Sequence, residues 1–331
     1  MSDVIYSIEH LKTYFPVRTK RMIAHEKKFV RAVDDVSLNI IRGETLGIVG
    51  ESGCGKSTLG RSIVRLVEPT SGRLTYNGID ITKLGRKAMR EHRKDLQIMF
   101  QDPYASLDPR MTVGNIIAEP LDYMKIEQDK ETRLRRIAEL MEVCGINKTF
   151  INRYPHEFSG GQRQRIGIAR ALSVFPKLIV CDEPVSALDV SIQSQIINLL
   201  IDLRKKYDLT LLFISHDLSV VEYISDRVAV MYLGRIIELS DTDELFINPL
   251  HPYTVALLES IPHIGERTLM GAADSLKGDI PSPVNPPSGC AFHTRCPDAC
   301  DDCTKITPVM VGISKKHFVC CLKYNKCKPD I

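Results

Sequence analysis

Short apolar runs alternate along this chain with longer segments in which apolar residues recur at helical spacing. Runs of five or six mostly apolar residues predict buried strands at 45–49, 96–100, 177–181 and 210–215. Helical spacing predicts helices over 59–66, 112–121, 131–143 and 166–174, and from 186 to about 206. Strands that alternate with helices in this way are typical of the α/β class.

Other segments have the signals of antiparallel strand pairs. A basic loop, 18–28, separates the first two strands, and Asn77-Gly78 is a strong hairpin signal. Paired strands are therefore predicted over 4–11 with 27–43, over 73–76 with 79–81, and within 227–239. Two short helices are predicted within 241–260, and from about residue 261 the chain is proline-rich and irregular.

Composition limits the class of protein. The chain has 331 residues, enough for about two domains, and its 44 lysines and arginines nearly balance 41 aspartates and glutamates. Such a balance gives no sign of a nucleic-acid or membrane-surface protein. Asp3 and Glu9 argue against a signal peptide, and no apolar run is long enough to span a bilayer. A role at a membrane would therefore require docking on other subunits.

The segment Gly50 to Thr58 carries the most specific motif. It reads GESGCGKST, which matches G-x-x-x-x-G-K-[ST], and it lies between a predicted strand and a predicted helix. Glycines let successive backbone N–H groups converge on phosphate oxygens at a helix N-terminus, so a chance glycine-rich turn is the weaker interpretation. Lys56 would reach the β- and γ-phosphates and the Ser57 hydroxyl would bind Mg²⁺. The predicted ATP and Mg²⁺ contacts here are Gly50, Ser52, Gly53, Cys54, Gly55, Lys56, Ser57 and Thr58.

Polar residues follow three of the predicted strands. Gln101 follows 96–100, where a polar side chain can reach a ligand. Asp182 and Glu183 follow 177–181, where two acids are costly unless they bind a cation or water, although they could simply cap the sheet edge. Asp182 suits the Mg²⁺ shell, and Glu183 suits a general base. His216 follows 210–215 and could polarise the γ-phosphate, whereas a lone histidine is more often structural.

A second anion-binding device lies about a hundred residues after the first. Ser159, Gly160, Gly161 and Gln162 precede a predicted helix, so their N–H groups would be exposed at its N-terminus. Alone, this tetrapeptide could be a plain helix cap. After a phosphate-binding loop it is much more specific.

Together these motifs, in this order and spacing, resemble the ATP-binding subunit of an ABC transporter over residues 4–260. The resemblance implies a P-loop NTPase fold of the α/β class with a mixed, mainly parallel core sheet and an antiparallel β subdomain. It also implies a helical subdomain at about 103–175, a nucleotide-binding domain over 1–260, and a small irregular extension over 261–331. Two such subunits would meet head to tail, with each ATP held between the phosphate loop of one and Ser159–Gln162 of the other.

The resemblance also implies roles for single residues. Phe15, or its neighbour Tyr14, would stack on adenine, although composition alone favours a core position for these aromatics. The implied catalytic residues are Glu183 as base, His216 as switch, Gln101 as Mg²⁺ sensor, and Lys56. Asp189, in the segment SALD, would communicate across the dimer, and Phe158 replaces the family's usual leucine. Because no catalytic position is degenerate, we expect ATPase activity.

Cysteines are concentrated at the end of the chain. Three of the ten lie in the first 289 residues, and the others are Cys290, Cys296, Cys300, Cys303, Cys320, Cys321 and Cys327. In a reducing cytosol such a cluster favours metal binding over disulfides. Four thiolates suit either an Fe–S cluster or tetrahedral zinc, and spacing alone does not decide between them. Free or oxidised thiols are the remaining alternative.

This tail, including Pro281 to Cys290 and Arg295-Cys296-Pro297, is similar to the C-terminal extension of oligopeptide and dipeptide importer ATPases, particularly their second ATPase. That resemblance implies a 4Fe-4S cluster on Cys290, Cys296, Cys303 and Cys320. Cys300, Cys321 and Cys327 are surplus, so Cys300 could substitute for Cys303, and Cys321 for Cys320.

The implied function is to power the uptake of di- and oligopeptides into the cell. This subunit would act at the cytoplasmic face of the cell membrane. The implied partners are a second ABC ATPase, two membrane permease subunits and an extracytoplasmic solute-binding protein. Nickel, an opine or another small solute is the alternative cargo. A soluble ABC protein of DNA repair or translation is disfavoured, because the chain has neither a long coiled-coil insertion nor a second cassette.

Overall fold

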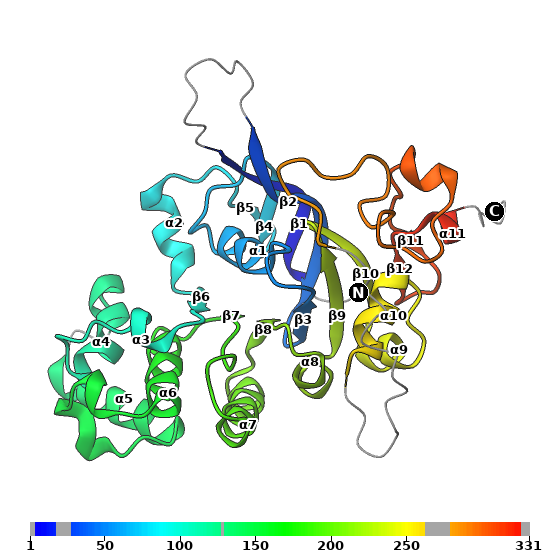
Figure 1. Cartoon of the computed structure of the whole chain (residues 1–331). Helices are drawn as coiled ribbons and strands as arrows, with labels where there is room; N and C mark the ends of the chain where they lie inside the picture. Colours follow the sequence, from blue (N-terminus) through cyan, green and yellow to red (C-terminus); the bar gives the residue numbers. More distant parts are fainter. Residues whose placement is uncertain (1–3, 18–27, 127–128, 262–278, 326–331) are drawn as a thin grey trace. The chain divides into compact units, whose positions relative to one another are not determined.

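The computed structural model describes residues 4–17, 28–126, 129–261 and 279–325 (Figure 1). Most of the predicted basic loop and Cys327 lie outside these residues. The chain divides into two compact units, each assembled from separate stretches of sequence. Within the described residues, the first unit contains 41–45 and 83–214 without 127–128, and the second contains 4–40, 46–82 and 215–325 with the gaps given above.

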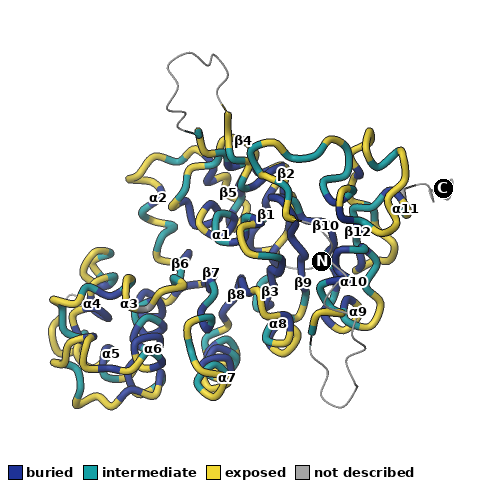
Figure 2. Tube along the Cα trace, viewed as in Figure 1, coloured by how far each residue is buried: buried dark blue, intermediate teal, exposed yellow. Residues whose placement is uncertain are grey.

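Three parallel strands form the sheet of the first unit. β6 (Leu96–Met99) pairs with β7 (Leu178–Asp182), which pairs with β8 (Thr210–Ile214). Every residue of β7 and β8 is buried, as Figure 2 shows. Strands buried on both faces have near-continuous apolar sequences, which explains why β7 and β8 were predictable. The predicted strand at β6 is confirmed as well, although only the first and last of its four residues are buried.

Helices make up most of the rest of this unit. α4 (Val113–Met124), α5 (Lys130–Val143) and α6 (Gly160–Leu172) contact one another, and α7 (Val190–Tyr207) contacts α6. The shorter helices are α2 (Arg86–Arg93), α3 (Pro103–Ser106), and the 3-10 turns η1 (Lys148–Asn152) and η2 (Pro155–Glu157). α6 begins six residues before the predicted start, because a capping box at Ser159 offsets the low helix propensity of two glycines. α7 begins at Val190, after its N-cap Asp189.

The second unit contains an antiparallel sheet in the order β2-β1-β4-β5. Its strands are β1 (Val4–Pro16), β2 (Phe29–Ile41), β4 (Ser71–Tyr76) and β5 (Ile79–Asp80). Asn77 and Gly78 both have positive φ, 46° and 76°, which confirms the predicted hairpin turn. β1 continues five residues beyond the predicted end, because Thr13 is buried and its hydroxyl lies 3.0 Å from that of Ser62.

A second set of paired strands in this unit consists of β3 (Thr45–Val49), β9 and β10. β3 pairs in parallel with β9 (Arg227–Tyr232). β9 pairs antiparallel with β10 (Arg235–Asp241), and this pair confirms the hairpin predicted within 227–239. The associated helices are α1 (Lys56–Ile63), α8 (Leu218–Ile224), α9 (Thr242–Ile247) and α10 (Pro252–Glu259). α8 was not predicted, although its N-cap Asp217 accepts hydrogen bonds from the Ser219 and Val220 amides. No helix among the described residues combines the length and apolarity that a bilayer span needs.

The extension is more regular than its sequence suggests. It contains η4 (Asp301–Thr304), β11 (Val311–Gly312), β12 (Phe318–Val319) and α11 (Leu322–Asn325), and β12 pairs with β10. His317 also anchors it, because its Nε2 lies 2.7 Å from the fully buried Glu238. Burial lowers the pKa of His317, but its bonds to Glu238 and Glu244 outweigh burial and raise that pKa above its ordinary value. The extension therefore belongs to the second unit, and an independent domain from residue 261 stays a prediction.

Candidate nucleotide-binding site

The phosphate loop lies in the second unit, between β3 and α1. Its conformation requires glycine at both ends: Gly50 has φ +150° and a Cβ there would lie 2.1 Å from the Met231 carbonyl oxygen. Gly55, the N-cap of α1, has φ +110° and its Cβ would lie 1.9 Å from the Ala32 carbonyl oxygen. The predicted helix started at Leu59, whereas α1 starts at Lys56, so the start of the helix coincides with the GKS end of the motif.

Lys56 is buried and its amine is held by the loop itself. Nζ donates to the carbonyl oxygens of Gly50 at 2.7 Å and Glu51 at 3.0 Å. The loop is also fixed to the β9–β10 turn, because the Gly234 amide donates to the Cys54 carbonyl at 2.8 Å. Ser57 and Thr58 lie in the first turn of α1, while Ser52 and Gly53 are exposed at the tip of the loop. Hydrogen bonds within the motif therefore hold the Lys56 amine against the backbone of the loop.

Three further predicted residues of this unit lie near the ends of strands. The Ser215 amide donates to the Ile48 carbonyl of β3 at 3.1 Å, which places His216, exposed, next to the strand that leads into the phosphate loop. Tyr14 and Phe15 end β1. Burial and the hydrogen bond from its hydroxyl to Asp34 raise the pKa of Tyr14 to about 12, whereas Phe15 as a residue is 39% exposed. Their stacking on adenine stays a prediction.

The first unit brings Gln101 and Glu183 together. β6 and β7 are parallel and Met99 is in register with Cys181, so both strands end at the same edge of the sheet. There Gln101 Nε2 donates to Glu183 Oε2 at 2.8 Å. Glu183 has φ +47°, uncommon for a residue with a side chain, and its amide donates to the Ile214 carbonyl at 3.0 Å. Asp182, the last residue of β7, is fully buried.

The signature tetrapeptide forms the N-terminus of α6. Ser159 Oγ accepts a hydrogen bond from the Gln162 amide at 3.4 Å, and Gln162 Oε1 accepts one from the Ser159 amide at 3.0 Å. Gly161 is required by packing, because a Cβ there would lie 2.5 Å from Ile192 of α7. Ser159 itself is exposed, as is Asp189, the N-cap of α7. The helix cap and the exposed serine occur together, so capping does not exclude an anion site.

Known protein families match both the part of the chain with the phosphate loop and the C-terminal extension. Residues 33–186 match the ABC transporter family, and residues 237–303 match the oligopeptide/dipeptide transporter C-terminal region. The oligopeptide transport ATP-binding proteins AppF of Bacillus subtilis and OppF of Salmonella typhimurium are each 51% identical over 325 residues, which is 98% and 97% of this chain and the same share of each relative. This chain belongs to the ABC transporter family. It is an ABC ATPase.

Solved structures support the fold of this ABC ATPase. The cassette MJ0796, in a dimeric post-hydrolysis state with ADP and phosphate, matches with a TM-score of 0.64 and 28% identity over 72% of this chain and 98% of that one. CbiO1 of Clostridium perfringens, part of the ABC transporter complex cbiONQ, matches with a TM-score of 0.63 and 28% identity over 74% of this chain and 92% of that one. The predicted P-loop NTPase fold is thus confirmed.

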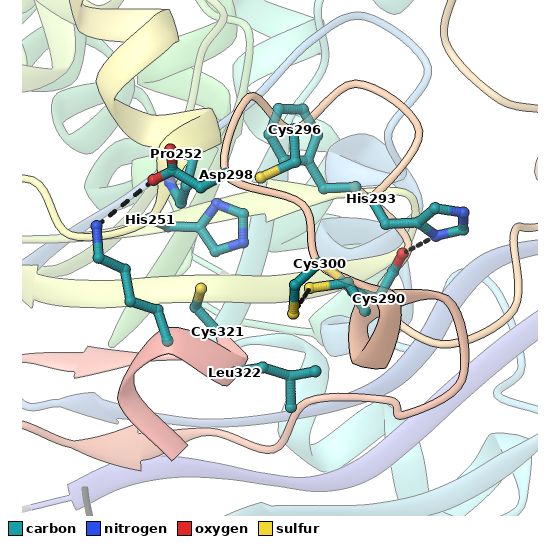
Figure 3. Close-up of a pocket in the computed structure, with 12 residues that line it drawn as sticks. His251, Pro252, Cys290, His293, Cys296, Asp298, Cys300, Cys321 and Leu322 are labelled. Carbon is teal, nitrogen blue, oxygen red and sulfur yellow. Dashed lines mark hydrogen bonds and ion pairs between the residues drawn. The ribbon is translucent and has the colours of Figure 1, made fainter. Parts of the chain in front are cut away.

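The extension of this ABC ATPase contains a hollow of about 340 Å³ lined by cysteines (Figure 3). Its walls include the five residues Cys290, Cys296, Cys300, Cys303 and Cys321. Cys320 does not line the hollow: its thiol donates to the Pro308 carbonyl at 3.2 Å. Among the residues that the structure describes, no three histidine, cysteine or acidic side chains are grouped so as to hold a single metal ion.

Sequence reasoning missed two residues at the phosphate loop. Arg295 of the extension forms an ion pair with Glu51, and the Tyr253 hydroxyl accepts a hydrogen bond from the Glu51 amide. Arg295 lies in the segment that identified the extension, but nothing in its sequence neighbourhood points to a residue 244 positions earlier. Only the fold reveals this contact.

Proposed function

We propose that this ABC ATPase powers the uptake of di- and oligopeptides through separate membrane subunits. Two relatives that are 51% identical are named as oligopeptide transport ATP-binding proteins, and a 53% identical relative in Brucella ovis is named a putative peptide import ATP-binding protein. The observation that carries the energy-coupling role is the Gln101–Glu183 hydrogen bond, because it orients a carboxylate at the edge where the strands of the first unit end.

In this proposal ATP binds to the phosphate loop, and Lys56 leaves the Gly50 and Glu51 carbonyls for the phosphates. Ser57 and Asp182 are the proposed Mg²⁺ residues, and the ion would neutralise charge on the phosphates. Glu183 takes a proton from the attacking water, while Gln101 holds its carboxylate and His216 contacts the γ-phosphate. Ser159–Gln162 of a second subunit completes each site, so ATP closes the dimer and loss of the γ-phosphate reopens it.

The proposed partners are a second ABC ATPase, two permease subunits and an extracytoplasmic solute-binding protein, with this chain at the cytoplasmic face of the membrane. We expect all four partner chains to copurify when the protein is isolated from gently solubilised native membranes. Peptides released from the solute-binding protein would identify the cargo by mass spectrometry. Purification with ribosomes or DNA would contradict the transport function, and nickel or an opine on the binding protein would contradict the peptide cargo.

We further propose that the cysteine-lined hollow holds a 4Fe-4S cluster. Thiols spread around a hollow suit a group of several metal atoms, each of which binds one cysteine, better than they suit one ion. The residues fit with one change: Cys321 replaces Cys320 in the ligand set, giving Cys290, Cys296, Cys303 and Cys321. Burial raises the pKa of the Cys296 thiol to about 11, so forming the cluster would release protons.

Two neighbouring cysteines provide a matched test of this site. Cys321→Ser should greatly lower the iron and sulfide content of protein purified without oxygen. Cys320→Ser should leave both contents unchanged, because the Cys320 thiol is hydrogen-bonded to the Pro308 carbonyl outside the hollow. Iron, acid-labile sulfide and zinc are measured together in each variant. Zinc without sulfide in the unmodified protein would refute the cluster. Loss of iron from Cys320→Ser alone would show that Cys320, and not Cys321, is the fourth ligand.

A further inference from the structure

All polar groups of Glu51, the second residue of the phosphate motif, are engaged. Its amide donates to the Tyr253 hydroxyl at 2.8 Å. Its carbonyl accepts from Lys56 Nζ at 3.0 Å and from the Cys54 amide at 3.3 Å. Its carboxylate accepts two hydrogen bonds from Arg295, at 2.7 and 3.0 Å. Glu51 thus attaches the loop to the rest of the second unit, in addition to the bond between the Gly234 amide and the Cys54 carbonyl.

The groups that hold Glu51 are themselves firmly placed. The Arg295 side chain is only 4% exposed, and its amide donates to the Phe292 carbonyl at 3.0 Å. Phe292 is buried and packs edge to face against Tyr232 and Tyr253, with ring centroids 5.2 and 5.4 Å apart. Phe292 also lines the cysteine hollow, and Arg295 immediately precedes Cys296. One aromatic block therefore connects the wall of the hollow to the phosphate loop.

We propose that Arg295 and Tyr253 are positioning residues of the ATP site, through which the cysteine-rich extension sets nucleotide affinity. Two physical effects act in the same direction. The bonds fix the loop before ATP arrives, so less conformational freedom is lost on binding. The guanidinium also neutralises a carboxylate that would otherwise repel the triphosphate a few residues from Lys56. The contacts through which the extension would act on the loop are the packing of Phe292 on Tyr253 and the ion pair of Arg295 with Glu51.

Titration of the full-length protein with Mg-ATP in a calorimeter tests this proposal. Arg295→Gln should weaken binding about tenfold, and Arg295→Lys, which keeps the charge but loses the two-pronged geometry, should have a smaller effect. The double variant Glu51→Gln/Arg295→Gln should recover part of the affinity, because the unpaired carboxylate is removed although the loop still lacks the bonds that fix it. Simple loosening of the extension predicts no such recovery.

Lys316→Gln is the matched control. Lys316 also belongs to the extension and forms an ion pair, at 2.6 Å, but its partner is Asp241 at the end of β10. This variant should bind Mg-ATP like the unmodified protein. Hydrogen exchange in the nucleotide-free protein gives a second readout: Arg295→Gln should accelerate exchange in 50–56 and leave exchange in 311–319 unchanged.

Unchanged affinity in folded Arg295→Gln, or equal losses in the single and double variants, would overturn the proposal. It rests on ATP binding to the phosphate loop and not on the solute that is carried. A failure of the unmodified protein to bind Mg-ATP would instead contradict the proposed function. The two outcomes are therefore distinguishable in one set of titrations.

Discussion

Glu183→Gln should lower kcat for ATP hydrolysis by about 10²–10⁴-fold, the usual contribution of a general base. Glutamine has the shape of glutamate but cannot accept the proton of the attacking water. Its amide oxygen can still accept the 2.8 Å hydrogen bond from Gln101, so the edge of the sheet should keep its geometry. ATP binding should therefore be retained, and a closed dimer should accumulate because the step that reopens it is blocked.

The measurement compares turnover with dimer formation at saturating ATP. Glu131→Gln, in the first turn of α5, removes an exposed glutamate of the same unit and should leave both unchanged. Because Glu183 has φ +47°, any substitution also meets a constrained backbone, and glutamine is the replacement that alters it least. Near-normal hydrolysis by Glu183→Gln would exclude Glu183 as the base.

The strands and the polar residues that follow them were predictable for a simple physical reason. A strand buried on both faces is apolar along most of its length, so polar residues such as Asp182 and Gln101 mark the place where the strand ends. Parallel neighbours end at one edge, which is why Gln101 and Glu183 meet although 82 residues separate them. The phosphate loop was predictable because its glycines are forced by backbone contacts, such as that between Gly55 and Ala32.

Contacts that depend on register or on distant packing were not predictable. Cys320 and Cys321 are adjacent, and their spacing fits either as a ligand. Their difference arises because the Cys320 amide donates to the Ile237 carbonyl of β10 at 2.8 Å, which fixes the end of β12 and leaves Cys321 on the hollow. The pairing of Arg295 with Glu51 likewise requires the whole second unit to be folded. Local sequence patterns contain neither kind of information.

Ser159→Asp should nearly abolish ATP turnover while leaving the protein as stable as before or slightly more so. Aspartate caps a helix as well as serine does, and its charge next to the N-terminus of α6 adds about 0.3–1 kcal/mol of stability. If a second subunit's ATP is bound at this N-terminus, however, the same charge faces its γ-phosphate. Juxtaposed like charges cost several kcal/mol, so turnover should fall about 10²-fold or more.

Ser159→Ala separates the two roles of this serine. Alanine loses the hydrogen bond to the Gln162 amide and should lower the free energy of unfolding by about 1 kcal/mol, yet it adds no charge and should retain more turnover than aspartate. Urea unfolding, Mg-ATP titration and steady-state hydrolysis are measured on both variants. A cap alone predicts that activity follows stability, with alanine the worse variant. Head-to-tail engagement predicts the opposite order, because only aspartate repels a phosphate brought by another subunit.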